Sequence, residues 1–228
     1  MGRFFNIDPL SEKYEFWSPY TFSGNRVVDA RELEGLEPNL PYKSYNEAAK
    51  NFGDQYNGMS IRMNGEIGTQ FYKVNTPTEN YYSYTLPKSG GPGSWFIEPR
   101  DSGPIPNEGV KVGEGHTHGS AGIQIPVGIG KFHDDNNMPS ESHDILRAKE
   151  NSKNPNYEGD VVITSGGYMF IYGPGTQNDG KRSREMTPVR TDLPKDPQSK
   201  TNPNNTVTPN NSPLVWPIDE SDDKYPLK

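Results

Sequence analysis

The sequence contains no cysteine, which excludes disulfide bonds, thiolate metal sites and a cysteine nucleophile. It has no apolar run long enough to cross a bilayer, and its first residues lack the basic and then apolar pattern of a signal peptide. Positive charge is scarce, because 23 lysines and arginines stand against 30 aspartates and glutamates. We therefore expect neither a nucleic-acid surface nor a membrane segment. Any metal must be bound by histidine, aspartate or glutamate.

Hydrophobic residues are also sparse, at 30% of the chain, whereas there are 24 glycines and 22 prolines. A packed core therefore cannot extend through every segment of the 228 residues. The regular patterns lie in residues 39–174, which we predict to form one domain. Residues 1–38 are dense in aromatic and turn residues and are typical of a fragment of something larger. Residues 175–228 are rich in asparagine, proline and charge, so we expect an extended or disordered tail.

The middle segment begins with a predicted helix over residues 44–56, in which Ser44 is the N-cap, Glu47 completes a capping box and Gly53 ends the helix. A second helix is predicted over residues 140–151. The strand patterns cover residues 59–75, 80–87, 109–119 and a hairpin over 159–174 that turns at 165–167. Together these elements predict an α+β fold, a mixed β-sheet flanked by a few helices.

The stretch GEGHTHGSAG holds two of the four histidines, His116 and His118. Residues i and i+2 of a strand lie on one face, so the two imidazoles should project together, with Val110, Val112 and Glu114 behind them. The residues of opposite parity are small enough to let another element approach closely: Gly113, Gly115 and Thr117. This pattern predicts two ligands of a metal site, although a His-x-His in a glycine-rich turn also arises by chance.

Further polar residues stand on either side of the histidines. Upstream, Glu66 lies between Gly65 and Gly68 in a predicted strand, where it is either a functional acid or an exposed strand glutamate. Downstream, Ser140 and Asp144 stand at the start of the second predicted helix. Serine and aspartate also favour helix starts for stability alone, so a capping role is the alternative.

The order glutamate, His-x-His, serine, aspartate resembles the JAMM (MPN+) metalloprotease motif, and NGEIGTQFY, GEGHTHG, PSESHD and YMFIYGP follow one another as in the JAB-like domains. The resemblance implies a JAB/MPN-like fold and a Zn²⁺ ion bound by His116, His118 and Asp144, with a water in the fourth position. It implies that Glu66 is the general base and that Ser140 donates a hydrogen bond to the oxyanion.

The spacing of the last two residues differs from that motif. Ser140 follows His118 by 22 residues, and Asp144 follows Ser140 by four. His143 is therefore an alternative to Asp144 as the third ligand, and Glu141 stands at the distance from Asp144 that the serine normally has. The intervening loop offers further ligands: His133, Asp134 and Asp135.

The stretches GRFFNIDPL, WSPYTFSGN and VVDARELEGLEP resemble the end of the core of Rhs (YD-repeat) proteins. In that family this segment closes a large β-shell and precedes a variable domain that is commonly a toxin. The resemblance implies that Asp8 and Asp29 cut the chain near Gly35 and Leu36. The residue after Asp29 departs from the family pattern, because Ala30 replaces the second proline. The alternative is that both aspartates only form turns.

The two resemblances together predict the toxin tip of an Rhs effector, a zinc-dependent peptidase or isopeptidase in which a metal-activated water attacks an amide carbonyl. The alternatives are a metal-dependent nuclease toxin and a non-catalytic binding module of the same fold. The expected partners are a cognate immunity protein, the Rhs core shell of the parent protein and a peptide or protein substrate. We expect secretion and delivery into a target cell by a specialised secretion system.

Overall fold

A computed structural model of the chain describes residues 41–196, except for residues 78, 92, 95, 96 and 120–136. Beyond these it gives the bounds of two short strand pairs: β1 (Arg31–Glu32) with β2 (Pro38–Asn39), and β7 (Ile125–Pro126) with β8 (Phe132–His133). Several expectations fall outside the described residues: Asp8, Asp29, the cleavage point at Gly35 and Leu36, the side chain of His133, Asp134, Asp135 and the tail from residue 197.

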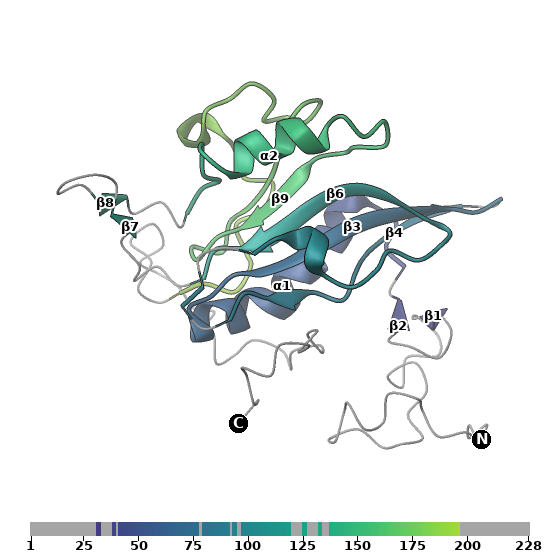
Figure 1. Cartoon of the computed structure of the whole chain (residues 1–228), viewed down its shortest axis with the longest axis horizontal. Helices are drawn as coiled ribbons and strands as arrows, with labels where there is room; N and C mark the ends of the chain where they lie inside the picture. Colours follow the sequence, from purple (N-terminus) through teal and green to yellow (C-terminus); the bar gives the residue numbers. More distant parts are fainter. Residues whose placement is uncertain are drawn as a thin grey trace, which may run out of the picture.

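A six-stranded mixed sheet forms the centre of the fold (Figure 1). Its strand order is β10-β9-β6-β3-β4, and β5 also pairs with β3. The strands are β3 (Ile67–Asn75), β4 (Asn80–Tyr84), β5 (Lys88–Ser89), β6 (Gly109–Thr117), β9 (Asp160–Ile163) and β10 (Met169–Tyr172). Neighbours are antiparallel except β6 and β9, which run parallel with α2 (Asp144–Asn151) between them in the chain. The predicted α+β fold with a mixed sheet is confirmed.

Helix α1 (Tyr45–Met63) covers one face of the sheet. It begins as predicted, because the Ser44 hydroxyl accepts a hydrogen bond from the Glu47 backbone N–H at 3.2 Å. The Glu47 carboxylate in turn accepts from the Lys43 N–H at 3.0 Å. The apolar residues that α1 buries against the sheet recur at helical spacing: Tyr45, Ala48, Ala49, Phe52 and Tyr56.

The predicted end of this helix at Gly53 is wrong, and so is the strand expected to start at residue 59. Gly53 lies inside α1, where a β-carbon would come within 2.6 Å of a Leu193 methyl. Leu193 thus occupies the space that a side chain at residue 53 would need, and this packing offsets the low helix preference of glycine. The helix continues to Met63 and stops at Asn64, which adopts a left-handed conformation with φ of 54°. The strand β3 consequently begins only at Ile67.

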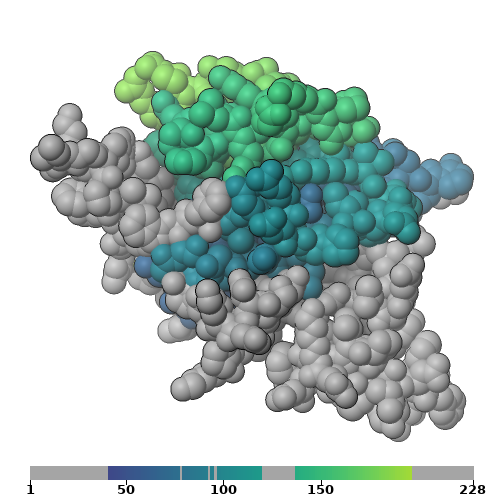
Figure 2. All heavy atoms as spheres, in the orientation of Figure 1, coloured from purple at the N-terminus to yellow at the C-terminus, as the bar shows by residue number. Residues whose placement is uncertain are grey.

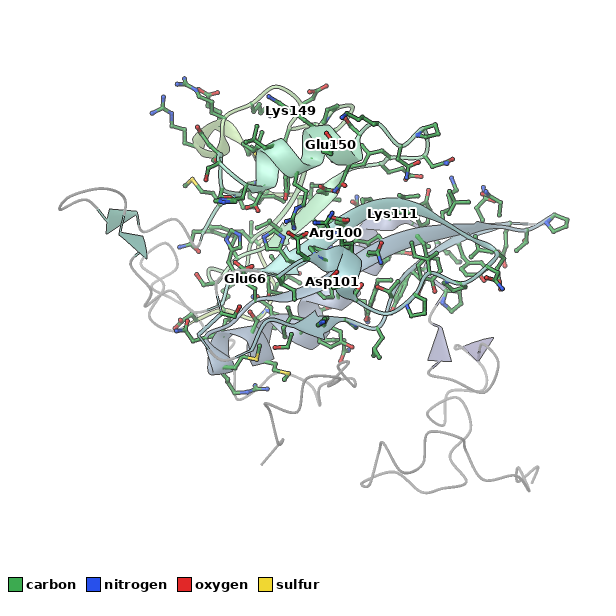
Figure 3. The ribbon with its side chains drawn as sticks, viewed as in Figure 1. Glu66, Arg100, Asp101, Lys111, Lys149 and Glu150 are labelled. Carbon is green, nitrogen blue, oxygen red and sulfur yellow. The ribbon has the colours of Figure 1, made fainter. Side chains whose placement is uncertain are left out.

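Helix α2 covers the opposite face, above the sheet in Figure 1. The strands β9 and β10 show why both faces are buried, because their residues alternate between the two sides. Val162 and Phe170 pack with Ala148 of α2, whereas Val161 and Ile171 belong to the core under α1. Two exposed residues of α2, Lys149 and Glu150, are labelled in Figure 3.

A β-bulge in β6 decides which of its residues face α2. Phe71 of β3 pairs with Gly113, but the next residue, Tyr72, pairs with Lys111, so Val112 is the additional residue. Val112 consequently lies in the core under α1. Its parity predicted the face of the histidines, and that prediction is wrong. Glu114, by contrast, lies on the face of the histidines as expected, because its carboxylate accepts a hydrogen bond from Asn151 of α2.

The packed domain extends beyond residue 174, where its end was predicted. Leu193 is fully buried in the main core, and the Asp196 N–H donates to the Ser165 carbonyl at 2.8 Å. Figure 2 shows residues 137–196, in green, packed directly against residues 41–119. The stretch 175–196 is irregular in structure but is part of the core. Among the described helices, none is long and apolar enough to span a membrane.

Candidate metal centre

The candidate site lies at the carboxyl end of β6, next to the amino terminus of α2. A strand and the crossover helix that follows it place their facing ends at the same edge of the sheet. In this fold β6 contributes His116 and the residue just after β6 is His118. Asp144 is the first residue of α2, and Glu66 directly precedes β3, the neighbour of β6. Three segments far apart in the chain therefore meet at one edge.

His116 and His118 project on the same side, as predicted. His116 is held in the middle of the sheet between Gly68 of β3 and Val162 of β9, and the His118 N–H extends the pairing by donating to the Ile163 carbonyl at 3.0 Å. Their ring centroids are 5.1 Å apart. Both imidazoles are nearly buried, with side-chain exposures of 8% and 9%.

The small residues on the other side of β6 make this position possible. A β-carbon on Gly115 would come within 2.5 Å of the Phe71 ring, and one on Gly113 within 2.5 Å of the Tyr45 hydroxyl. Thr117 donates to Ser60 of α1 at 2.6 Å. The close approach predicted for these positions is confirmed, since α1 and β3 press against them.

Asp144 directs its carboxylate at both histidines. His116 Nε2 lies 3.4 Å from Oδ1, and His118 Nε2 lies 3.5 Å from Oδ2. These separations exceed the 2.7–3.2 Å of an N–H···O hydrogen bond. They match instead the separation of about 3.3 Å between two ligand atoms that share a tetrahedral ion at bond lengths of about 2.0–2.1 Å. Asp144 therefore faces both imidazoles, each through a different carboxylate oxygen.

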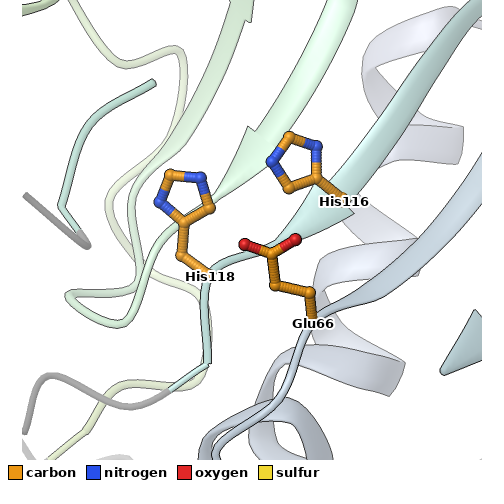
Figure 4. Close-up of side chains that lie close together, drawn as sticks. All are labelled: Glu66, His116 and His118. Carbon is orange, nitrogen blue, oxygen red and sulfur yellow. The ribbon is translucent and has the colours of Figure 1, made fainter. Parts of the chain in front are cut away.

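Glu66 completes the group. Its carboxylate and one nitrogen from each of His116 and His118 all lie within 4.8 Å of one another, so these three residues can hold a metal ion. Figure 4 shows the Glu66 carboxylate facing the space between the two rings. Glu66 is half-buried and not the exposed strand glutamate that was the alternative. Two backbone hydrogen bonds hold it, to Ser94 at 2.9 Å and from Gly90 at 2.8 Å.

The protonation states of His116 and Asp144 suit a cation. Burial lowers the pKa of His116 to about 4, so its imidazole is neutral near pH 7 and has a lone pair to offer. Burial opposes ionisation of Asp144, but the two imidazoles and the Ser140 N–H outweigh it and lower the pKa of that carboxyl below its usual value. Burial raises the pKa of Glu66 to about 8, with His118 acting in the opposite direction. A carboxyl that titrates near neutral pH can both accept and release a proton.

The remaining predicted residues lie at the start of α2. The Ser140 hydroxyl accepts from the Asp144 N–H at 3.1 Å, and the Ser140 N–H donates to Asp144 Oδ2 at 2.6 Å. Ser140 thus has the capping contacts that were its alternative role, although His143 occupies the N-cap position. The ring of His143 is exposed and contacts the Ser142 hydroxyl at 3.0 Å, and Glu141 is exposed as well. The geometry therefore brings Asp144, and not His143, to the histidines.

Sequence reasoning missed three groups beside the site. The Ile97 N–H donates to the Glu66 carboxylate, and Arg147 contacts both Ile97 and Glu98. Arg147 stands one turn after Asp144 on α2, so helical spacing could have drawn attention to it. The part played by residues 97 and 98 has no local signal, because the fold alone brings them to this edge.

Comparison with known proteins adds no relative to this picture. No family model, no curated protein and no solved structure matches the chain.

Proposed function

We propose that this chain is a zinc-dependent peptidase or isopeptidase and forms the toxin tip of an Rhs effector. The observation that carries the proposal is the spacing of the Asp144 oxygens, 3.4 and 3.5 Å from Nε2 of His116 and His118, with Glu66 beside the two rings. Two imidazoles and one carboxylate are a donor set that zinc prefers, and three protein ligands leave a coordination position open. The Rhs and JAMM resemblances of the sequence support the toxin context and the reaction class.

The residues would divide the work as follows. His116, His118 and Asp144 would hold the ion, which when bound supplies a Lewis acid and lowers the pKa of water toward ~7. Glu66 would accept a proton from the attacking water and pass it to the leaving amine. Ser140 would orient Asp144 through the N–H that it donates, and its hydroxyl would donate to the oxyanion.

The test is a zinc titration of the purified chain, followed by elemental analysis. We expect about one Zn²⁺ per chain, a higher melting temperature with zinc and the loss of both effects in His116→Ala. The matched control is His143→Ala, which removes an exposed imidazole one residue from Asp144 and should bind zinc like the wild type. A wild-type chain that binds no zinc, and whose stability EDTA does not change, would refute the metal centre.

Activity is tested separately with a panel of peptides and isopeptide-linked lysine substrates. Glu66→Gln should retain zinc and the fold but lose cleavage, because the amide cannot accept the proton. Plasmid DNA and RNA, each with and without EDTA, form the opposing arm of the assay. Metal-dependent cleavage of nucleic acid without cleavage of any amide would overturn the peptidase proposal and favour the nuclease. An immunity protein would be sought by its ability to protect cells that express the wild type. Cells that express the inactive Glu66→Gln should need no such protection.

A further inference from the structure

The side chain of Arg147 connects α2 to the segment that precedes η2 (Pro99–Asp101). Its Nη2 donates to Glu98 Oε1 at 2.8 Å, and its Nη1 donates to the Ile97 carbonyl at 3.4 Å. Both charged side chains are largely shielded from solvent, with exposures of 23% for Arg147 and 22% for Glu98. Arg147 lies one turn along the same helix from Asp144. Any shift of residues 97–98 would therefore be transmitted through Arg147 to α2 and to Asp144.

The other side of this connection is Glu66. The backbone N–H of Ile97 donates to the Glu66 carboxylate. This contact is possible because Gly68, two residues after Glu66, has no side chain. A β-carbon there would lie 3.0 Å from both Cγ1 and Cγ2 of Ile97 and 3.2 Å from the Pro99 α-carbon. Residues 97–99 consequently lie flat on β3, where Ile97 reaches the acid.

We infer that the Arg147–Glu98 ion pair is a clamp that sets the position of Asp144 relative to Glu66, so that the ion and the proton acceptor face each other. Both are positioning residues: Arg147 contacts Glu98 and the Ile97 carbonyl, and Glu98 contacts Arg147 and Arg100. The inference rests on the proposed zinc site.

The chain offers a matched control for this clamp. Arg100 also forms an ion pair with Glu98, at 3.1 Å, but it belongs to η2 and is 69% exposed. Arg100→Met therefore removes a guanidinium from the same carboxylate without affecting α2. Arg147→Met retains the aliphatic stem and removes the connection to Glu98 and Ile97.

The experiment measures zinc affinity of the full chain by competition with a chromogenic chelator, and measures the stability of the zinc-free protein separately by urea unfolding. We expect Arg147→Met and Glu98→Gln each to weaken zinc binding by about 10- to 100-fold, as loss of support for metal ligands typically does. The double variant should bind zinc no less tightly than the single variant with the lower affinity, because both changes break the same interaction. Arg100→Met should stay within about twofold of the wild type, and Arg147→Lys should regain part of the loss.

A purely structural role would lower the stability of the zinc-free protein and leave the zinc affinity of the folded molecules unchanged. Equal zinc affinity of Arg147→Met and Arg100→Met, with a wild type that binds zinc, overturns the clamp alone. A wild type that binds no zinc overturns the proposed function and the clamp together. If Arg147→Met does not fold, Glu98→Gln and Arg147→Lys give the same comparison from the other side of the pair.

Discussion

Asp160 gives this domain a pH dependence that can be measured without knowing the substrate. The residue is the first of β9, is 2% exposed and lies under the carboxyl-terminal end of α2. Its Oδ1 accepts from the Glu114 N–H at 3.0 Å, and its Oδ2 accepts from Asn151 Nδ2 at 2.8 Å. The same Asn151 nitrogen donates to the Glu114 carboxylate at 3.1 Å. Burial raises the pKa of Asp160 to about 7, although these hydrogen bonds oppose the rise.

The sign of the effect follows from the two pKa values. In the unfolded chain the carboxyl has a pKa of about 3.9, so between that value and about 7 the folded state binds more protons than the unfolded state. The free energy of unfolding therefore falls as pH rises through this window. A carboxyl with these two values makes the free energy of unfolding at pH 8 about 2–3 kcal/mol lower than at pH 5.

The perturbation is Asp160→Asn, which keeps the shape of the side chain and carries an N–H where the protonated acid carries its O–H. Urea unfolding of both proteins at pH 5 and pH 8 gives four free energies. The variant should lose about 2–3 kcal/mol less than the wild type across this range, since the groups that do not interact with Asp160 contribute equally to both proteins. Equal losses in the two proteins would mean that Asp160 ionises normally and would refute the reasoning.

Three further substitutions test the fold and the site. Leu193→Ala should destabilise the domain by about 2–5 kcal/mol in urea unfolding because it empties a fully buried core position, whereas a loss below about 0.5 kcal/mol would return this segment to the tail. Ser44→Ala should cost about 1 kcal/mol through the lost hydrogen bond from Glu47, and an unchanged urea midpoint would contradict the cap. Gly68→Ala should push Ile97 off the sheet, so zinc should still bind while amide cleavage falls, and full activity would show that the contact to Glu66 is dispensable.

The features that depend on neighbouring residues in the chain were predicted well. The Ser44 cap, the strand that carries His116 and the hairpin turn at residues 165–167 each follow from short-range patterns, and the structure has all three. The same holds for the shared side of His116 and His118, because two residues of rise along an extended chain return a side chain to the same face. The expected Rhs and JAMM relationships stay predictions.

The features that depend on packing were missed. Gly53 is a helix breaker by local preference, yet α1 runs through it because Leu193 packs into the space that its missing side chain leaves. Val112 changes face because the bulge adds one residue to β6 opposite β3. In both cases contacts with residues distant in the chain outweigh a local preference worth about 1 kcal/mol or less.

By itself the sequence determined the donor types available for a metal, the pairing of His116 with His118 and the class of the fold. Only the tertiary structure brought Asp144, and not His143, within 3.5 Å of the two imidazoles and brought Glu66 beside them. The two candidates are adjacent in the chain, but consecutive residues at a helix start point in directions about 100° apart, so the seat of α2 on the sheet selects one of them. That seat depends on Ala148, Asn151 and Arg147 meeting partners from β9, β6 and residues 97–98, which no local pattern specifies.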